Sequence, residues 1–135
     1  MESLSFEKRQ RVEGLLLQIE NAIQQLTEWN LSVLSADDYY QSSEGMQKLA
    51  ASCMMIEAIG EGINQIDKVT NGLFLPLYPD IPWVDIIGIR NHIAHGYFDI
   101  DGEIVFSVIK NDLVSLSKAI AFLKTQLTKE HEGKA

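Results

Sequence analysis

Apolar residues recur every three or four positions along most of this 135-residue chain. That spacing places them on one face of an α-helix. It predicts long helices over residues 6–34, 43–69 and 113–128, a helix from Pro82 that frays near Gly96, and a short helix over residues 103–110. No stretch of useful length shows the alternation of a half-buried strand. The sequence therefore predicts an all-α fold, an up-and-down bundle of four main helices plus short helices.

Capping residues mark several of the expected helix ends. Ser5 is placed to cap the first helix, and Ser35 is placed to cap a short turn that follows it. Gly72 suits the left-handed backbone conformation that closes a helix, so the second helix should end just before it. The last helix is expected to begin at a cap supplied by Asn111 or Asp112.

The helix expected over residues 43–69 carries two apolar stripes. The first contains Met46, Leu49, Cys53, Ile56, Gly60 and Ile63, and the second contains Met55, Ile59, Gly62 and Ile66. A helix that buries a single face has no need of the second stripe. Either this helix is central in the bundle or its second stripe meets another subunit, and we favour a homodimer contact.

Size and composition indicate one domain. With 46% hydrophobic residues, 135 residues are enough for one core and too few for two ordinary domains. We expect a single helical domain over residues 1–128 and a polar, disordered tail over residues 129–135. The lone Cys53 has no partner for an internal disulfide, which favours a reducing, cytoplasmic location. No run approaches the roughly 18 to 20 apolar residues of a membrane span, so no membrane association is expected.

The charge balance limits the partners that the protein can bind. Lys and Arg total 11 against 19 Asp and Glu, which gives a formal net charge of −8. This balance excludes a generic basic coat for nucleic acid, and no DNA partner is expected. Any binding to phosphate must be local and must depend on a few positioned side chains.

The most unusual segment places Arg90, Asn91, His92, His95 and Tyr97 within eight positions. If the helix continues, Asn91 and His95 are four residues apart and share a face. A guanidinium can hold a phosphate through two N–H groups, and an imidazole that titrates near neutral pH can move the proton of a ribose hydroxyl. Arg and His are also favoured at a helix C-terminus by the helix dipole alone, so the spacing leaves both interpretations open.

Other candidate groups carry weaker signals. His92 and His95 are three residues apart, but no third nitrogen or sulfur ligand lies nearby, so neither a metal site nor a cofactor is expected. Glu57 and Glu61 are four residues apart on one helix face. They could act as a pair of acids, although a solvated or interface carboxylate pair is the interpretation that we favour.

The segment from Arg90 to Tyr97 resembles a motif of HEPN-domain proteins, specifically the HepT-like (DUF86) toxins: an arginine, four residues, a histidine, one residue and a tyrosine. The resemblance extends to four further segments, in order along the chain. They are Ile59-Gly60-Glu61, Tyr78-Pro79-Asp80-Ile81-Pro82-Trp83, Ile86-Ile87-Gly88-Ile89-Arg90-Asn91 and Glu103-Ile104-Val105. Together they cover roughly residues 34–123.

This resemblance implies a HEPN-type homodimer whose two motif segments form one composite cleft. It also implies a metal-independent endoribonuclease that cleaves RNA as the toxin of a toxin–antitoxin pair. Arg90 and His95 would be catalytic, and Asn91 would assist them. Tyr97 corresponds to the tyrosine that a minimal nucleotidyltransferase antitoxin modifies with AMP. His92 lies at a variable place in the motif and is either an extra phosphate contact or, as we favour, a tolerated surface residue.

An alternative function is a noncatalytic HEPN-type binding module that partners a nucleotidyltransferase. The net charge of −8 favours this alternative, because RNA gains no help in approaching an acidic molecule. The presence of both Arg90 and His95 favours the enzyme, because a pure scaffold has no chemical need of the pair.

Overall fold

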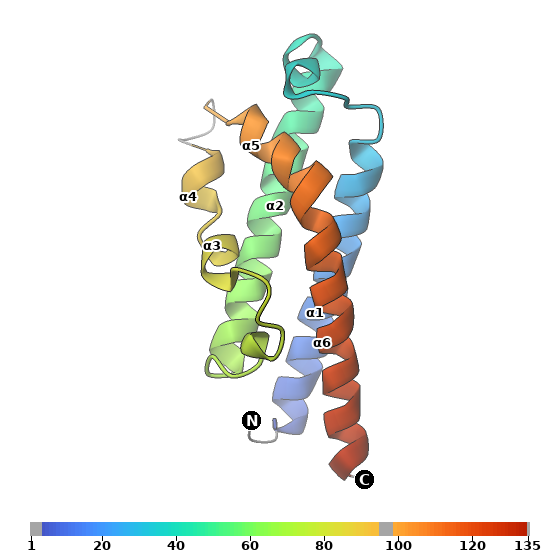
Figure 1. Cartoon of the computed structure of the whole chain (residues 1–135), viewed down its shortest axis with the longest axis vertical. Helices are drawn as coiled ribbons and strands as arrows, with labels where there is room; N and C mark the ends of the chain where they lie inside the picture. The colour runs from blue at the N-terminus through green and yellow to red at the C-terminus, as the bar shows by residue number, and fades with distance from the viewer. Residues whose placement is uncertain (1–3, 95–98, 135) are drawn as a thin grey trace.

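The fold is described here from a computed structural model, which describes residues 4–94 and 99–134. Its elements are α1 (Phe6–Trp29), η1 (Ala36–Tyr40), α2 (Ser43–Val69), η2 (Leu75–Leu77), α3 (Trp83–Ile87), α4 (Arg90–Ile93), α5 (Gly102–Ser107), η3 (Val108–Asp112) and α6 (Leu113–Lys134). The long helices α1, α2 and α6 run along the length of the molecule, and α3 and α4 lie along one flank of α2 (Figure 1). Within the described ranges the only extended pairing is one isolated bridge, so the predicted all-α bundle is confirmed. No helix in these ranges is both long and apolar enough to cross a bilayer.

The first helix begins where the sequence predicts and ends earlier. The Ser5 hydroxyl accepts a hydrogen bond from the backbone N–H of Lys8 at 3.2 Å, which confirms the predicted cap. The helix stops at Trp29 instead of continuing to Leu34. Asn30 follows it and is fully buried, and its side-chain amide donates to the C=O of Leu26 at 2.9 Å. The same C=O also accepts from the backbone N–H of Asn30 at 3.3 Å, so both donors of Asn30 hold the end of the helix.

Asn30 is also the centre of a buried polar network. Its amide donates to the Ser52 hydroxyl at 2.9 Å, and its carbonyl oxygen Oδ1 accepts from the Tyr39 hydroxyl at 2.8 Å. Lys110 Nζ donates to the backbone C=O of Asn30 at 2.8 Å. Burial raises the pKa of Tyr39 to about 12, so its hydroxyl stays protonated and remains a donor. The network joins α1, η1, α2 and η3 at one end of the bundle.

The short turn after α1 begins at the predicted residue. Ser35 occupies the N-cap of η1, and the Asp38 carboxylate accepts from the backbone N–H groups of Leu34 at 2.8 Å and Ser35 at 3.3 Å. The bond from Leu34, with a smaller contribution from Ser35, holds the pKa of Asp38 below its ordinary value. The carboxylate therefore supplies much of the capping that the sequence assigns to the serine.

The second long helix has the predicted bounds. The Ser42 hydroxyl accepts from the backbone N–H of Gly45 at 2.9 Å, which caps its start. At its end Gly72 has a φ of 75°, as predicted, and Asn71 has a φ of 54°. The Gly72 N–H donates to the C=O of Asp67 at 2.9 Å, which closes the helix in the manner of a left-handed C-terminal cap.

Most of both apolar stripes of α2 is covered inside one chain, and Met46 at the start of the first stripe is 47% exposed. Ile59, Gly62 and Ile66 of the second stripe are buried, and α1 packs directly on them. A Cβ on Gly62 would lie 3.3 Å from Cγ1 of Ile19 in α1. The interpretation of this stripe as a homodimer contact is therefore wrong, because α2 is the central helix of the bundle.

The chain from Gly102 to Lys134 forms one continuous helical rod. Asp101 caps α5 by accepting from the backbone N–H of Ile104 at 3.2 Å. A π-helical turn, η3, then joins α5 to α6 without a break. The prediction that Asn111 or Asp112 caps a separate last helix is wrong, because both residues lie inside this turn. The backbone of α6 is helical to Lys134, beyond the expected boundary at Lys129, because no proline stops it.

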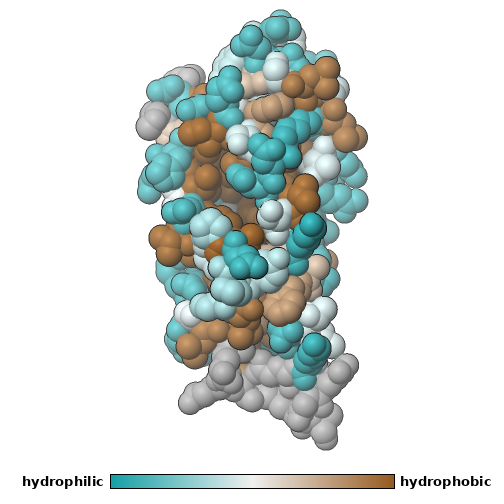
Figure 2. All heavy atoms as spheres, viewed as in Figure 1, coloured by the Kyte–Doolittle hydropathy of each residue, from teal (hydrophilic) through white to brown (hydrophobic). Residues whose placement is uncertain are grey.

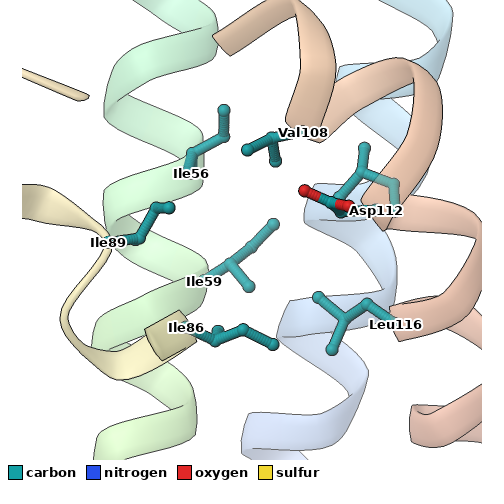
Figure 3. A pocket seen from close by; sticks show the side chains of 8 residues that line it. Ile56, Ile59, Ile86, Ile89, Val108, Asp112 and Leu116 are labelled. Carbon is teal, nitrogen blue, oxygen red and sulfur yellow. The ribbon is translucent and has the colours of Figure 1, made fainter. Parts of the chain in front are cut away.

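A small apolar cavity of about 60 Å³ lies where three parts of the bundle meet. Figure 3 shows Ile56 and Ile59 of α2 facing the side chains that converge on them from the α3 segment and from the α5–α6 rod. Apolar side chains also line the hollow on this face of the molecule (Figure 2). Asp112 is the one charged residue in the cavity lining. A space of this size and polarity is a packing gap and offers no set of polar groups to orient a substrate.

Candidate active site

The α3–α4 segment lies against α2 because Gly60 lets it approach closely. A Cβ on Gly60 would lie 2.9 Å from the backbone oxygen of Ile86 and 3.2 Å from Cγ2 of Ile89. At the start of α3 the Trp83 indole N–H donates to the C=O of Tyr78 at 2.9 Å, which fixes the connector that precedes it. Helix α2 therefore determines where the following polar segment lies.

The helix predicted from Pro82 to near Gly96 is broken into two short pieces. The first ends at Ile87, and the Gly88 N–H donates back to the C=O of Val84 at 3.0 Å. The second, α4, is a single turn that ends at Ile93, because Ala94 is extended with φ −148° and ψ 137°. The continuous helix on which Asn91 and His95 would share a face therefore ends before Ala94, and His95 itself lies outside the described residues.

Within α4 one side chain is buried and three are exposed. Ile93 is fully buried and anchors the turn in the core, whereas Arg90, Asn91 and His92 face solvent. Two of these three, Arg90 and Asn91, line the same groove, and His92 does not contribute to it. The structure thus brings together Arg90 and Asn91 of the predicted catalytic set.

His95 and Tyr97, the predicted catalytic histidine and modified tyrosine, lie outside the described residues. The chain on either side of them is described. Ala94 and Ile100 pair as an isolated antiparallel bridge, and the Asp101 N–H donates to the C=O of Ile93 at 2.8 Å. The chain therefore leaves the groove at Ala94 and returns beside it at Ile100.

Tyr40 fixes the returning strand of chain. Its hydroxyl donates to the C=O of Ile100 at 3.3 Å and accepts from the N–H of Gly102 at 3.2 Å. A Cβ on Gly102 would lie 2.6 Å from that hydroxyl oxygen, so the close contact depends on glycine. No local signal in the sequence indicates this contact, because Tyr40 and Ile100 are 60 residues apart along the chain.

The groove itself lies between α2 and the α4 segment and has a volume of about 410 Å³. Its walls come from four residues of α2 and four from the chain around α4. They are Ala50, Cys53, Met54 and Glu57 on the first side, and Arg90, Asn91, Ala94 and Ile100 on the second. The sequence indicates Arg90 and Asn91 on the second side, whereas nothing in it places Ala50 and Met54 at a site.

The electrostatics of the groove leave the guanidinium available. No hydrogen bond or ion pair to another residue in the described ranges engages the side chain of Arg90. Across the groove, the Cys53 thiol donates to Oε1 of Glu57 at 3.9 Å. Burial, and then the negative charge of Glu57, raises the pKa of Cys53 to about 11. Cys53 is therefore a neutral thiol at ordinary pH and is a poor nucleophile.

The described residues contain no group of three or more His, Cys, Asp or Glu side chains that could hold a metal ion. What the groove does offer is an exposed guanidinium beside an amide, which is a donor set that suits an anionic oxygen such as that of a phosphate.

Two kinds of comparison relate the chain to known proteins. The family model described as ribonuclease HepT-like matches residues 15–123. A protein of Methanocaldococcus jannaschii that is named as a candidate RNase is 32% identical over 65 residues, which cover 48% of this chain and 56% of that protein. A protein of Thermococcus cleftensis that is named as a candidate ribonuclease HepT is 33% identical over 61 residues, which cover 45% of this chain and 52% of that protein.

These similarities have a defined extent. The chain spans about half the length of the curated relatives that it matches. No solved structure matches the chain with significance. The family model covers both α2 and the α4 segment, and so both sides of the groove. The chain belongs to the HepT-like ribonuclease family.

Proposed function

We propose that this protein is a metal-independent endoribonuclease that acts as the toxin of a toxin–antitoxin pair. One observation carries the proposal: Arg90 and Asn91 line one groove, and no carboxylate of the described residues neutralises the guanidinium. Membership of the HepT-like ribonuclease family and the names of the relatives support RNA as the substrate. The activity of the whole protein and its partners belong to the proposal.

Arg90 is assigned to the scissile phosphate. A guanidinium presents two parallel N–H groups to two phosphate oxygens and keeps its charge at all working pH values. Its attraction strengthens as negative charge grows on the phosphate oxygens in the transition state. Asn91, on the same side of the groove, can donate its amide N–H to a further oxygen and orient the phosphate.

His95 is assigned to proton transfer. It is bonded directly to Ala94, which lines the groove, and three residues of chain separate it from Asn91. As a base, its imidazole takes the proton of a ribose 2′-hydroxyl while the 2′-oxygen attacks the adjacent phosphorus. The bond from phosphorus to the 5′-oxygen breaks, and that oxygen takes up a proton. The products are a 2′,3′-cyclic phosphate end and a 5′-hydroxyl end.

The active form is proposed to be a homodimer. A single groove offers one guanidinium and one amide to a phosphate, and a second copy facing it would double both. Two facing copies would place two guanidinium groups in one cleft, which offsets locally the net charge of −8. Sedimentation of the purified chain at micromolar concentration tests this part of the proposal, and a monomer would contradict it.

Regulation is assigned to Tyr97 and to a minimal nucleotidyltransferase antitoxin. An AMP group on this hydroxyl would add negative charge and bulk two residues from His95, and would therefore repel an RNA phosphate. Mass spectrometry after co-expression with such a partner should show the mass of AMP on Tyr97. A complex that leaves Tyr97 unmodified and yet suppresses toxicity would contradict this assignment.

The test of activity compares the wild type with Arg90→Ala and His95→Ala, with Lys118→Ala as the matched control. Lys118 is an exposed cation in a different groove, between α1 and α6. Purified wild type and Lys118→Ala should cleave RNA in the presence of a chelator, and the other two variants should not. A plot of the logarithm of the RNA-binding constant against the logarithm of the salt concentration should be shallower by about 0.7 for Arg90→Ala, because one phosphate contact is lost.

Expression without the antitoxin gives the second readout. The wild type should arrest growth and degrade cellular RNA, whereas Arg90→Ala and His95→Ala should do neither. If the folded wild type leaves both growth and RNA intact, the toxin assignment fails and a noncatalytic module that binds a nucleotidyltransferase becomes the better account.

A further inference from the structure

The α2 side of the groove has a composition that phosphate binding does not explain. Ala50, Cys53, Met54 and Glu57 follow the three-and-four spacing of one helical face, and all four line the groove opposite Arg90. Three of them form an apolar floor, and the fourth places a carboxylate at its end. This arrangement suits a ligand that is partly flat and apolar and partly a hydrogen-bond donor.

Glu57 is the informative residue. Its side chain is half-buried, and within the described residues it forms no ion pair. Its one hydrogen bond there is the weak contact from the Cys53 thiol at 3.9 Å. An ionised carboxylate accepts hydrogen bonds and donates none. It also repels a phosphate, so the part of a bound RNA that faces Glu57 must be a group with N–H donors.

We propose that Glu57 reads a guanine base next to the phosphate held by Arg90; the inference rests on the proposed ribonuclease function and names its base preference. Guanine presents N1–H and the N2 amine side by side on its Watson–Crick edge, and these two donors match the two oxygens of one carboxylate. Adenine and cytosine place an acceptor beside their amine, and uracil places its N–H between two carbonyl groups. Bases of single-stranded RNA are commonly read on this edge while their ring faces pack on side chains.

The floor of the groove supplies the ring-face contact. Met54 is 72% exposed and Ala50 is exposed, so both can meet a flat base without any rearrangement of the core. The thioether of methionine packs well on an aromatic ring. The Cys53 thiol contacts Oε1 of Glu57, so the other oxygen and the remaining lone pairs stay available to a base.

Nucleotide binding tests this inference without any need for cleavage. Calorimetry should show that the protein binds guanosine 3′-monophosphate at least about tenfold more tightly than adenosine 3′-monophosphate, a typical discrimination for a two-bond base contact. Inosine 3′-monophosphate lacks the N2 amine and keeps N1–H, so its affinity should be intermediate. Glu57→Gln should remove the preference for guanine and leave the affinity for the adenine nucleotide unchanged.

The matched control is Glu61→Gln, one helical turn further along α2. Glu61 is exposed, lies outside the groove lining, and accepts only from Gln65 Nε2 at 3.4 Å within the described residues. This variant should keep the guanine preference. Thermal unfolding of both variants identifies any loss of folding, and Met54→Ala serves as a second variant that should weaken all bases alike.

Each outcome has a clear meaning. Equal binding of the three nucleotides by the wild type, no detectable binding, or a guanine preference that survives Glu57→Gln would overturn the inference. Cleavage of an oligouridine with one guanine then separates the two proposals. RNA cleavage without guanine preference overturns the base assignment alone, whereas a guanine preference in binding without any RNA cleavage overturns the ribonuclease function and keeps the nucleotide site.

Discussion

Replacing Gly60 with alanine should damage both stability and activity, because it forces apart the two segments that form the site. The added Cβ would lie 2.9 Å from the backbone oxygen of Ile86, whereas ordinary contact begins near 3.4 Å. The obstacle is a backbone atom, so no rotation of a side chain relieves it. The α3 backbone must move away from α2 by about half an ångström.

The magnitude follows from two opposing effects. In the middle of a helix, alanine is better than glycine by about 1 kcal/mol. Overpacking a filled site costs about 1 to 3 kcal/mol, and more where the neighbour cannot adjust. Gly14 in α1 is the matched control, because a Cβ there meets nothing within 4 Å. Gly14→Ala should therefore gain about 1 kcal/mol of unfolding free energy, and Gly60→Ala should be about 1 to 3 kcal/mol less stable than Gly14→Ala.

Urea denaturation of both variants, with the dependence on denaturant checked for constancy, measures the difference. Cleavage of RNA by Gly60→Ala under conditions where it is fully folded should fall several-fold or more, because α4 carries Arg90 and moves with α3. Equal stabilisation by Gly14→Ala and Gly60→Ala would show that α3 does not approach α2 at this point, and the account of how the site is positioned would fail.

Two further predictions concern the supports of the bundle and of the site. The pKa of the Tyr39 hydroxyl is 10.0 in the unfolded chain and about 12 in the folded protein. Its contribution to the free energy of unfolding is therefore complete below pH 10 and is lost between pH 10 and 12, at about 1.4 kcal/mol per pH unit. Tyr39→Phe should abolish this dependence of stability on pH, as measured by urea unfolding of the variant and the wild type. At neutral pH the variant should also be about 1 to 2 kcal/mol less stable, because Asn30 Oδ1 loses its donor. An unchanged dependence on pH would refute the role of burial. Gly102→Ala should displace the Tyr40 hydroxyl and lower RNA cleavage several-fold. The same substitution should lower cleavage less when Tyr40 is already replaced by alanine. Strictly additive losses in the double variant would show that the contact does not matter.

The parts of the fold that could be predicted are those in which local chemistry decides the structure. Ser5 lies next to a clear helical period, and its hydroxyl caps α1 as expected. Gly72 closes α2 because its left-handed conformation suits glycine better than any other residue. Each of these signals involves residues within a few positions of one another.

The parts that could not be predicted depend on contacts between distant segments. Asn30 ends α1 because Tyr39 and Ser52 surround its side chain, and the apolar pattern alone continues past it. The break at Gly88 lets Ile86 and Ile89 follow the surface of α2 at Gly60, a constraint that is absent from the local sequence. The second stripe of α2 was misassigned for a related reason, because periodicity reports that a face is covered and does not identify what covers it.

The candidate site divides in the same way. Arg90 and Asn91 stand out because polar residues interrupt an apolar segment, and they do line one groove. Glu57 stands out in the sequence only as a possible acid pair with Glu61, and Met54 does not stand out, because their position opposite Arg90 arises from the packing of α4 on α2. The groove is thus a property of the tertiary structure, even though half of its chemistry is visible in one short segment.

Exposure separates the residues that are proposed to act on RNA from the residues that hold the site. The side chains of Arg90 and Asn91 are exposed and form no hydrogen bond or ion pair within the described residues, so their replacement should change stability by no more than about 0.5 kcal/mol. Gly60 is buried against Ile86, so its replacement must change stability and activity together. The loss of RNA cleavage, compared with the loss of unfolding free energy, therefore distinguishes a chemical role from a supporting one. Applied to His95, the same ratio tests the assigned proton transfer: a large loss of cleavage at unchanged unfolding free energy fits that role, and a proportional loss of both contradicts it.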